Sequence, residues 1–170
     1  LLVNRKKFKN VLVVLGGTSG ERAVSLDSGR ACIKALKKKG YKVSSFDPKK
    51  KNLNLIDKNK TDVIFNALHG KGGEDGVIQS FFEYIGLPYT HSGPLSSMLA
   101  MNKHFSKKLF VKNNIKTPRY FFLDKKDFSK EIIKKEVKKN NLKFPIVVKP
   151  NDEGSSIGVN ICRDFNPLFV

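Results

Sequence analysis

The regular alternation of short apolar segments with helix-length segments most constrains the fold of this chain of 170 residues. An apolar run, Val11 to Leu15, ends at a glycine-rich turn, and a helix is predicted from about Glu21 to Lys39, just before Gly40. The pattern recurs, with strands predicted at 41–46, 62–68 and 87–90 and a second helix at 76–84. Such alternation produces parallel βαβ units with right-handed crossovers. We therefore predict an α/β fold, with a complete parallel-sheet domain over residues 1–97.

Finer details of the first helix are also predicted. Ser19 or Thr18 is expected to cap it, because their side-chain oxygens accept hydrogen bonds from the N–H groups of a first turn. Its core face is expected to carry Val24, Ala31 and Ala35, with Cys32 and Leu36 beside them.

The pattern changes near residue 94. Two consecutive helices are predicted at 94–100 and 102–114, and a lysine-rich helix at 128–140, with strands at 118–123, 144–149 and 158–162. These strands are too few to close a stable sheet on their own. We therefore expect residues 98–170 to form an incomplete second domain.

Composition argues against several classes of function. The formal net charge is +18, but the lysines lie in scattered short runs without the arginine and aromatic interleaving that stacks on bases. A nucleic-acid-binding module is therefore the weaker hypothesis. No apolar run reaches the length of a membrane span, and the two cysteines form no CxxC pair. We expect a cytoplasmic protein without a membrane or nucleic-acid partner.

Four polar side chains on two turns are predicted at the carboxyl ends of strands, where open α/β sheets bind ligands. Glu21 follows the first glycine-rich turn and lies at a helix start, where a carboxylate stays ionised and could pair with an ammonium group. The turn after the third strand begins with His69 and contains Glu74 and Asp75. The alternatives are a carboxylate that only complements a helix dipole and a structural histidine. The histidines show no paired spacing typical of metal ligands.

A second group of candidates suits phosphate. Lys149 ends an apolar strand and is followed by the turn Gly154-Ser155-Ser156-Ile157-Gly158. A lysine with free backbone N–H groups and hydroxyls is the combination that phosphoryl oxygens need. The alternative is an ordinary hairpin turn. Lys103, at the start of a helix, is unremarkable by itself.

Taken together, these segments resemble the D-alanine–D-alanine ligases of the ATP-grasp superfamily. The resemblance rests on three blocks in the same order and spacing over nearly the whole chain: Gly16 to Leu26, Ala67 to Thr90 and Val148 to Val159. It implies a Rossmann-like N-terminal domain over 1–97, followed by a truncated ATP-grasp central domain over 98–170. It also implies ATP-dependent joining of two D-alanines, through an acyl phosphate, for peptidoglycan synthesis.

The resemblance also implies roles for single residues. Glu21 would hold the ammonium of the first D-alanine and His69 would lie beside that substrate. Ser155 would hydrogen-bond with Glu21 and a lid tyrosine and is expected, with Glu21, to be catalytic. The ATP phosphates would be contacted by Lys103, Lys149, Glu153, Gly154, Ser155 and Ser156. The Mg²⁺ ligands and the adenine site would lie beyond residue 170, so this chain alone is expected to hold no metal and to be inactive. A homodimer is also implied.

Two departures from the family's usual pattern stand out. Asn102 replaces an aspartate before Lys103, and His91 replaces a glycine, so the backbone of that turn is expected to differ. The alternatives that stay open are a ligase that uses D-lactate or D-serine as its second substrate, a basic nucleic-acid-binding module, and a non-catalytic fragment that folds only with a partner.

Overall fold

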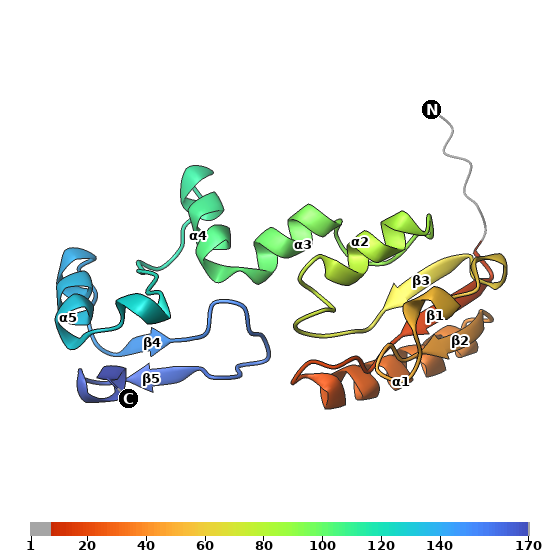
Figure 1. The fold of residues 1–170 in the computed structure, drawn as a ribbon, viewed down its shortest axis with the longest axis horizontal. Helices are drawn as coiled ribbons and strands as arrows, with labels where there is room; N and C mark the ends of the chain where they lie inside the picture. The colour runs from red at the N-terminus through yellow and green to blue at the C-terminus, as the bar shows by residue number, and fades with distance from the viewer. Residues whose placement is uncertain (1–7, 170) are drawn as a thin grey trace. The chain divides into compact units, whose positions relative to one another are not determined.

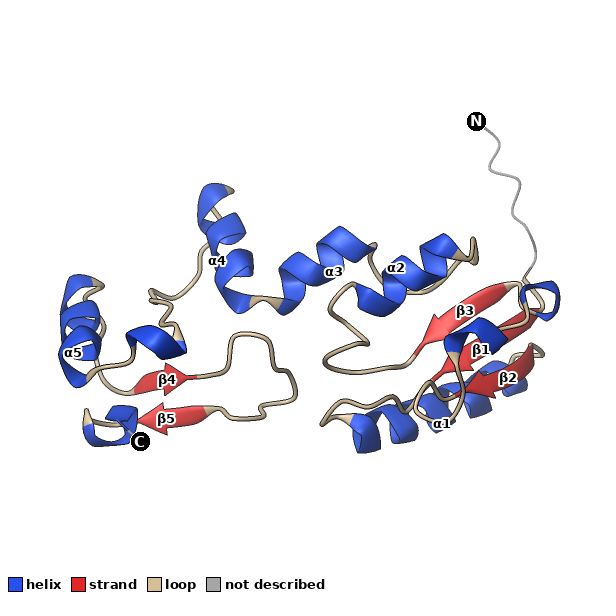
Figure 2. Ribbon diagram, in the orientation of Figure 1, coloured by secondary structure: helices blue, strands red, loops and turns tan. Residues whose placement is uncertain are grey.

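The computed structural model describes residues 8–169 and shows two compact units, divided between Met101 and Asn102 (Figure 1). The described part of the first unit contains three strands and three α-helices, and the strands of the second unit are shorter than those of the first (Figure 2). No helix in the described part of the chain combines the length and apolar character needed to cross a membrane.

The first unit is built on a parallel sheet of three strands, which confirms the predicted α/β fold. Its strands lie in the order β2-β1-β3, and Ile64 of β3 also pairs with Tyr89 through an isolated parallel bridge. The elements of this unit are β1 (Asn10–Val14), α1 (Arg22–Lys38), β2 (Lys42–Phe46), β3 (Val63–Asn66), α2 (Val77–Tyr84) and α3 (Pro94–Met101). The loop of residues 47–62, between β2 and β3, contains two 3₁₀ turns.

The central strand β1 supplies both faces of the core. Leu12 and Val14 pack with Ile78 and Phe82 of α2, whereas Val11 and Val13 pack against α1 on the opposite face. Alternating side chains of a strand point to opposite faces, and burial of both is typical of a parallel sheet covered by helices. The carboxyl ends of β1 and β3 are therefore held firmly, and the candidate site lies just beyond them.

The predicted core face of α1 is wrong for Val24, Ala31 and Ala35 and right for Leu36. Val24 is exposed, and so are Ala31 and Ala35, whereas Ser25 and Gly29 are the buried residues of the helix. A Cβ at Gly29 would lie 2.7 Å from the Cβ of Leu15, so the helix approaches the sheet through small residues. The apolar residues that pack there are Leu26, Ile33 and Leu36. The predicted cap is also wrong: Glu21 occupies the N-cap position and makes no side-chain capping bond, although Ser19 Oγ accepts the N–H of Glu21 at 3.2 Å.

The second unit contains α4 (Lys103–Lys112), α5 (Lys130–Lys139) and an antiparallel pair, β4 (Ile146–Val148) with β5 (Asn160–Cys162). Its core joins Ile133 and Val137 of α5 to Cys162. The predicted strand at 118–123 is wrong, because this segment makes no strand ladder in the structure. Phe121 and Leu123 instead pack against the core from an irregular segment.

Candidate functional site

The turn that leads from β1 into α1 places Glu21 at the carboxyl edge of the sheet. Gly16 and Gly17 both have positive φ values, 86° and 72°, which favour glycine over other residues. The Glu21 side chain is almost fully buried, with 3% of its surface exposed. A buried carboxylate requires compensating groups, so its neighbours define what this site can bind.

The turn after β3 carries His69 and Glu74 and closes on itself. The N–H groups of Gly73 and Glu74 donate to the Gly70 carbonyl at 3.0 and 2.9 Å, and the N–H of Gly70 donates to Glu74 Oε2 at 2.7 Å. Asp75 accepts the N–H of Gly72 at 2.8 Å, so this carboxylate shapes the turn. Glu74 is therefore oriented by the same turn that carries His69.

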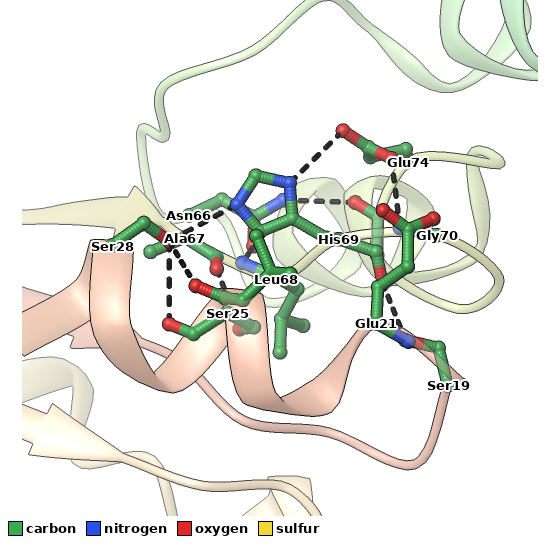
Figure 3. A network of polar contacts seen from close by, with 12 residues as sticks. Ser19, Glu21, Ser25, Ser28, Asn66, Ala67, Leu68, His69, Gly70 and Glu74 are labelled. Carbon is green, nitrogen blue, oxygen red and sulfur yellow. Dashed lines mark hydrogen bonds and ion pairs between the residues drawn. The ribbon is translucent and has the colours of Figure 1, made fainter. Parts of the chain in front are cut away.

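Glu21, His69 and Glu74 come together (Figure 3). One potential ligand atom from each lies within 4.8 Å of the other two, and His69 Nδ1 is 3.6 Å from Glu74 Oε1. A Cβ at Gly70 would lie 2.8 Å from Glu21 Oε1, so only glycine leaves room for the carboxylate. Two carboxylates beside one imidazole form an acidic cluster that suits an ammonium group, and the same three groups also have the donor types that hold a divalent cation.

Two serines on α1 support this cluster (Figure 3). Ser28 Oγ donates to the Val24 carbonyl at 2.9 Å and lies 3.0 Å from His69 Nε2, so it orients the imidazole. Ser25 is fully buried: its hydroxyl donates to the Ala67 carbonyl at 2.6 Å and accepts the N–H of Gly16 at 2.8 Å. Ser25 thereby joins the ends of β1 and β3. Neither serine is predicted as a site residue from the sequence, although they follow Glu21 at positions i+4 and i+7, which share one helix face.

An ion pair holds the turn that precedes Glu21. Arg22 Nη2 donates to Asp47 Oδ2 at 2.7 Å, and Arg22 Nη1 donates to the Gly17 carbonyl at 2.7 Å. Asp47 also accepts the backbone N–H groups of Gly17 and Lys49 at 3.1 and 3.0 Å. The hydrogen bonds from Arg22, helped by these backbone donors, lower the pKa of Asp47 to about 2. The carboxylate is thus ionised at neutral pH and keeps the turn closed.

In the second unit, Lys103 is tied to the segment that follows β4. Its backbone N–H donates to the Asn151 carbonyl at 3.1 Å, and its ammonium group donates to the carbonyls of Asn151, at 3.3 Å, and Glu153. Asn151 Oδ1 in turn accepts the N–H of His104 at 3.0 Å. Asn102 is the N-cap of α4, and its side chain accepts the N–H of Phe105 at 3.0 Å. Asn102, which departs from the family pattern, therefore caps α4.

Lys107 lies in the same unit as the two predicted lysines, Lys103 and Lys149. Lys107 lies one turn after Lys103, donates to the Pro118 carbonyl at 2.8 Å and lies 4.7 Å from the centre of the Tyr120 ring. Burial and then the charge of Lys149 lower the pKa of Lys107, so Lys149 lies close enough to act on Lys107. The sequence analysis missed Lys107, although its i+4 spacing from Lys103 was a usable signal.

The turn 154–158 has a backbone suited to anions. Ser155 and Ser156 have positive φ values of 47° and 60°, and the N–H of Ile157 donates to the Gly154 carbonyl at 2.9 Å. Consecutive residues in unusual turn conformations make the concave N–H arrangements that hold phosphate oxygens. The structure thus brings Glu21 to His69 within the first unit, and Lys103 to the 151–153 segment within the second. The predicted bond of Ser155 to Glu21 stays a prediction.

Comparison with known proteins gives consistent results. A family model described as "D-ala D-ala ligase N-terminus" matches residues 46–92, and one described as "D-ala D-ala ligase C-terminus" matches residues 109–169. The D-alanine–D-alanine ligase of Pelagibacter ubique is 50% identical over 160 residues, which cover 94% of this chain and 52% of that protein. The chain spans about half the length of the curated relatives it matches.

Similar solved structures point to the same family as the sequence comparisons. The D-alanine–D-alanine ligase of Bacillus anthracis complexed with ATP is 36% identical with a TM-score of 0.75, and the match covers 94% of this chain and 52% of that one. The VanG D-Ala:D-Ser ligase of Enterococcus faecalis is 28% identical with a TM-score of 0.69, over 91% of this chain and 55% of that one. The fold is therefore shared by ligases that are named for different second substrates.

Proposed function

This chain belongs to the D-alanine–D-alanine ligase family, and we propose that it carries the first D-alanine site and part of the ATP phosphate site of such a ligase. The reaction would join two D-alanines to give D-alanyl-D-alanine for peptidoglycan synthesis. We propose the cytoplasm as its compartment because ATP is available there, and a homodimer as its assembly because the family resemblance implies one.

The convergence of Glu21, His69 and Glu74 carries this proposal. Glu21 and Glu74 would accept hydrogen bonds from the ammonium group of the first D-alanine. Burial of Glu21 strengthens its attraction to that ammonium group because less water screens the pair. His69, oriented by Ser28, would lie beside the substrate.

The lysines of the second unit fit the triphosphate of ATP. Lys103, Lys107 and Lys149 supply positive charge, and the turn 154–158 supplies backbone N–H groups. When bound, ATP would supply the phosphoryl group that activates the substrate carboxylate. The protein residues hold the phosphate oxygens and neutralise their charge, which is the main protein contribution to phosphoryl transfer. Glu153, Gly154, Ser155 and Ser156 stay proposed contacts of ATP, and the Mg²⁺ ligands beyond residue 170 stay a prediction.

Ligand titrations of the chain followed by amide NMR test the two sites separately. D-Alanine is expected to shift the resonances of residues 69–76, and L-alanine and D-lactate, which lack the right configuration or the ammonium group, to bind at least tenfold more weakly. Glu21→Gln removes one charged hydrogen-bond acceptor, worth about 1.5–3 kcal/mol, so D-alanine affinity should fall at least tenfold. Glu83→Gln, on α2, is the control for loss of a carboxylate elsewhere in the unit. Tight binding of Mn²⁺ without D-alanine binding would contradict the ammonium site.

Activity is best tested in a chimera, because the chain spans only half the length of its relatives. Residues 8–169 would replace the matching half of the Pelagibacter ubique ligase. The chimera would be incubated with Mg-ATP and D-alanine, with D-lactate and D-serine as competing second substrates. Mass spectrometry is expected to find D-alanyl-D-alanine from the chimera and no dipeptide from the 170-residue chain alone. A folded chimera that releases neither dipeptide nor ADP would refute the proposed reaction.

A further inference from the structure

The carbonyl of Gly73 anchors the turn that carries Glu74. It accepts two side-chain amide donors, Asn66 Nδ2 at 3.0 Å and Gln79 Nε2 at 2.9 Å. Asn66 ends β3 and Gln79 lies in α2, and both side chains are buried. These two hydrogen bonds tie the middle of the turn to two fixed elements of the first unit.

The same two amide groups face His91. Its Nδ1 lies 3.1 Å from Asn66 Nδ2 and 3.4 Å from Gln79 Nε2. Asn66 Oδ1 accepts the N–H of Leu68, and both amide nitrogens donate to the Gly73 carbonyl, so the nitrogens are the atoms that face His91. An amide nitrogen only donates, and therefore Nδ1 must be the acceptor. The arrangement requires a neutral imidazole with its proton on Nε2.

The backbone of His91 supports a specific role for this side chain. Its φ of 109° lies in a region that residues other than glycine rarely adopt. Such a conformation persists only where surrounding contacts hold it, and strained residues of this kind cluster at functional sites. The two amide contacts at Nδ1 are contacts of this type.

We propose that His91 is a positioning residue of the first D-alanine site: as the shared acceptor, it keeps the amides of Asn66 and Gln79 directed at the Gly73 carbonyl. This inference deepens the proposed function and rests on it. Protonation of Nδ1 would convert the acceptor into a third donor, directed at two other donors. The amides would then turn away, and the turn that carries Glu74 would lose its two anchors.

The groups around His91 determine the pH at which it becomes protonated. The charged groups that act on His91 are Glu74, which favours protonation, and His69, which opposes it; β3 and α2 present the neutral amides of Asn66 and Gln79. Burial, with the smaller effect of His69, outweighs the charge of Glu74 and lowers the pKa of His91. The anchored turn is therefore the state at neutral pH, and the anchors are lost only on acidification below the range where an ordinary histidine titrates.

Nitrogen-15 NMR of the chain tests this directly, because the sequence contains only three histidines. His91 is expected to be neutral with its proton on Nε2 at pH 7. As it becomes protonated, the hydrogen-exchange protection factors of the Gly73 and Glu74 amides should fall about five- to tenfold, the effect of losing one or more ordinary hydrogen bonds. D-Alanine affinity should fall over the same pH range.

Two variants separate positioning from a general loss of stability. His91→Asn keeps an acceptor oxygen, tolerates positive φ and does not titrate, so the turn should stay protected at every pH. His104→Asn removes another histidine whose pKa burial lowers, in the second unit, and should leave the pH dependence of the turn unchanged. If His91→Asn does not fold, His91→Gly suits the backbone and removes the acceptor; protection should then be low at pH 7 and insensitive to acid.

The inference would be overturned by a proton on Nδ1 at pH 7, or by equal loss of protection in wild type and His91→Asn on acidification. Wild-type protection factors that stay constant while His91 titrates would also overturn it. Absence of D-alanine binding at every pH would refute the proposed function instead, since the protection factors report on the His91 network without any ligand.

Discussion

Removal of the Asp47 charge is expected to destabilise the first unit by a predictable amount. The pKa of this carboxyl falls from its ordinary 3.8 to about 2 because Arg22 and backbone N–H groups donate hydrogen bonds to it. At about 1.4 kcal/mol for each pH unit, the ionised carboxylate contributes about 2.5 kcal/mol to the free energy of unfolding at pH 7. Asp47→Asn keeps the shape of the side chain, so most of this contribution should be lost.

The pH dependence has a definite sign. Because the pKa is lower in the folded than in the unfolded chain, the stabilisation is complete above about pH 4 and is lost as the pH falls towards 2. Urea unfolding, followed by the amide resonances of β1, would measure the free energy of the first unit. The difference between wild type and Asp47→Asn should be about 2.5 kcal/mol at pH 7 and should shrink steadily between pH 4 and pH 2.

Asp27→Asn is the matched control. Asp27 also pairs with an arginine, Arg30, at 3.2 Å, but both side chains are mostly exposed. Exposed pairs of this kind contribute about 0–1 kcal/mol, so this variant should be close to wild type. Equal effects of Asp47→Asn and Asp27→Asn, or an effect of Asp47→Asn that does not change with pH, would refute the reasoning.

Three further variants test the site itself. Gly70→Ala should weaken D-alanine binding at least tenfold more than Gly72→Ala, because both residues have positive φ but only at Gly70 would the new Cβ collide with a carboxylate; calorimetric titration would show this. Ser28→Ala removes the hydroxyl beside the imidazole and should weaken D-alanine binding about fivefold, whereas Ser80→Ala, whose hydroxyl donates to the Gly76 carbonyl at the N-cap of α2, should not change it. Lys107→Met should lower the affinity for ATP and its dependence on salt without changing D-alanine affinity, as competitive nucleotide binding would measure.

The order of strands and helices in the first unit could be predicted because β1 and β3 contain apolar runs and because Gly16 and Gly40 mark the ends of the first strand and the first helix. The packed face of α1 could not: periodicity favoured Val24, but close approach of the helix to Leu15 selects Gly29 and Ser25 instead. Small and polar residues at such an interface carry no hydrophobic signal. The predicted strand at 118–123 is wrong for a related reason. Aromatic and apolar residues favour strands, but they also pack against a core when no neighbouring strand is there to pair with them.

Some residues of the candidate site could also be predicted from the sequence, and others could not. Glu21 and His69 could be predicted because both follow strands at the carboxyl edge, where the topology brings strand ends together. Asp47 and Gln79 act on the site from separate elements, and their contacts depend on side-chain geometry that one sequence does not reveal. His91 was noted as a departure from the family pattern, but its role as an acceptor follows only from the positions of two amide nitrogens.

The buried hydroxyl of Ser25 has a consequence for substrate size. By joining the Gly16 N–H to the Ala67 carbonyl, it makes the two turns that carry Glu21 and His69 part of the sheet itself. The spacing of these two turns is then set by the separation of neighbouring strands, about 4.8 Å. In a ligase of this kind, the fixed spacing of the two turns would limit the size of the first amino acid. Binding of a larger amino acid would therefore require a smaller side chain near Glu21 and His69. Greater mobility of the loops would not create the space.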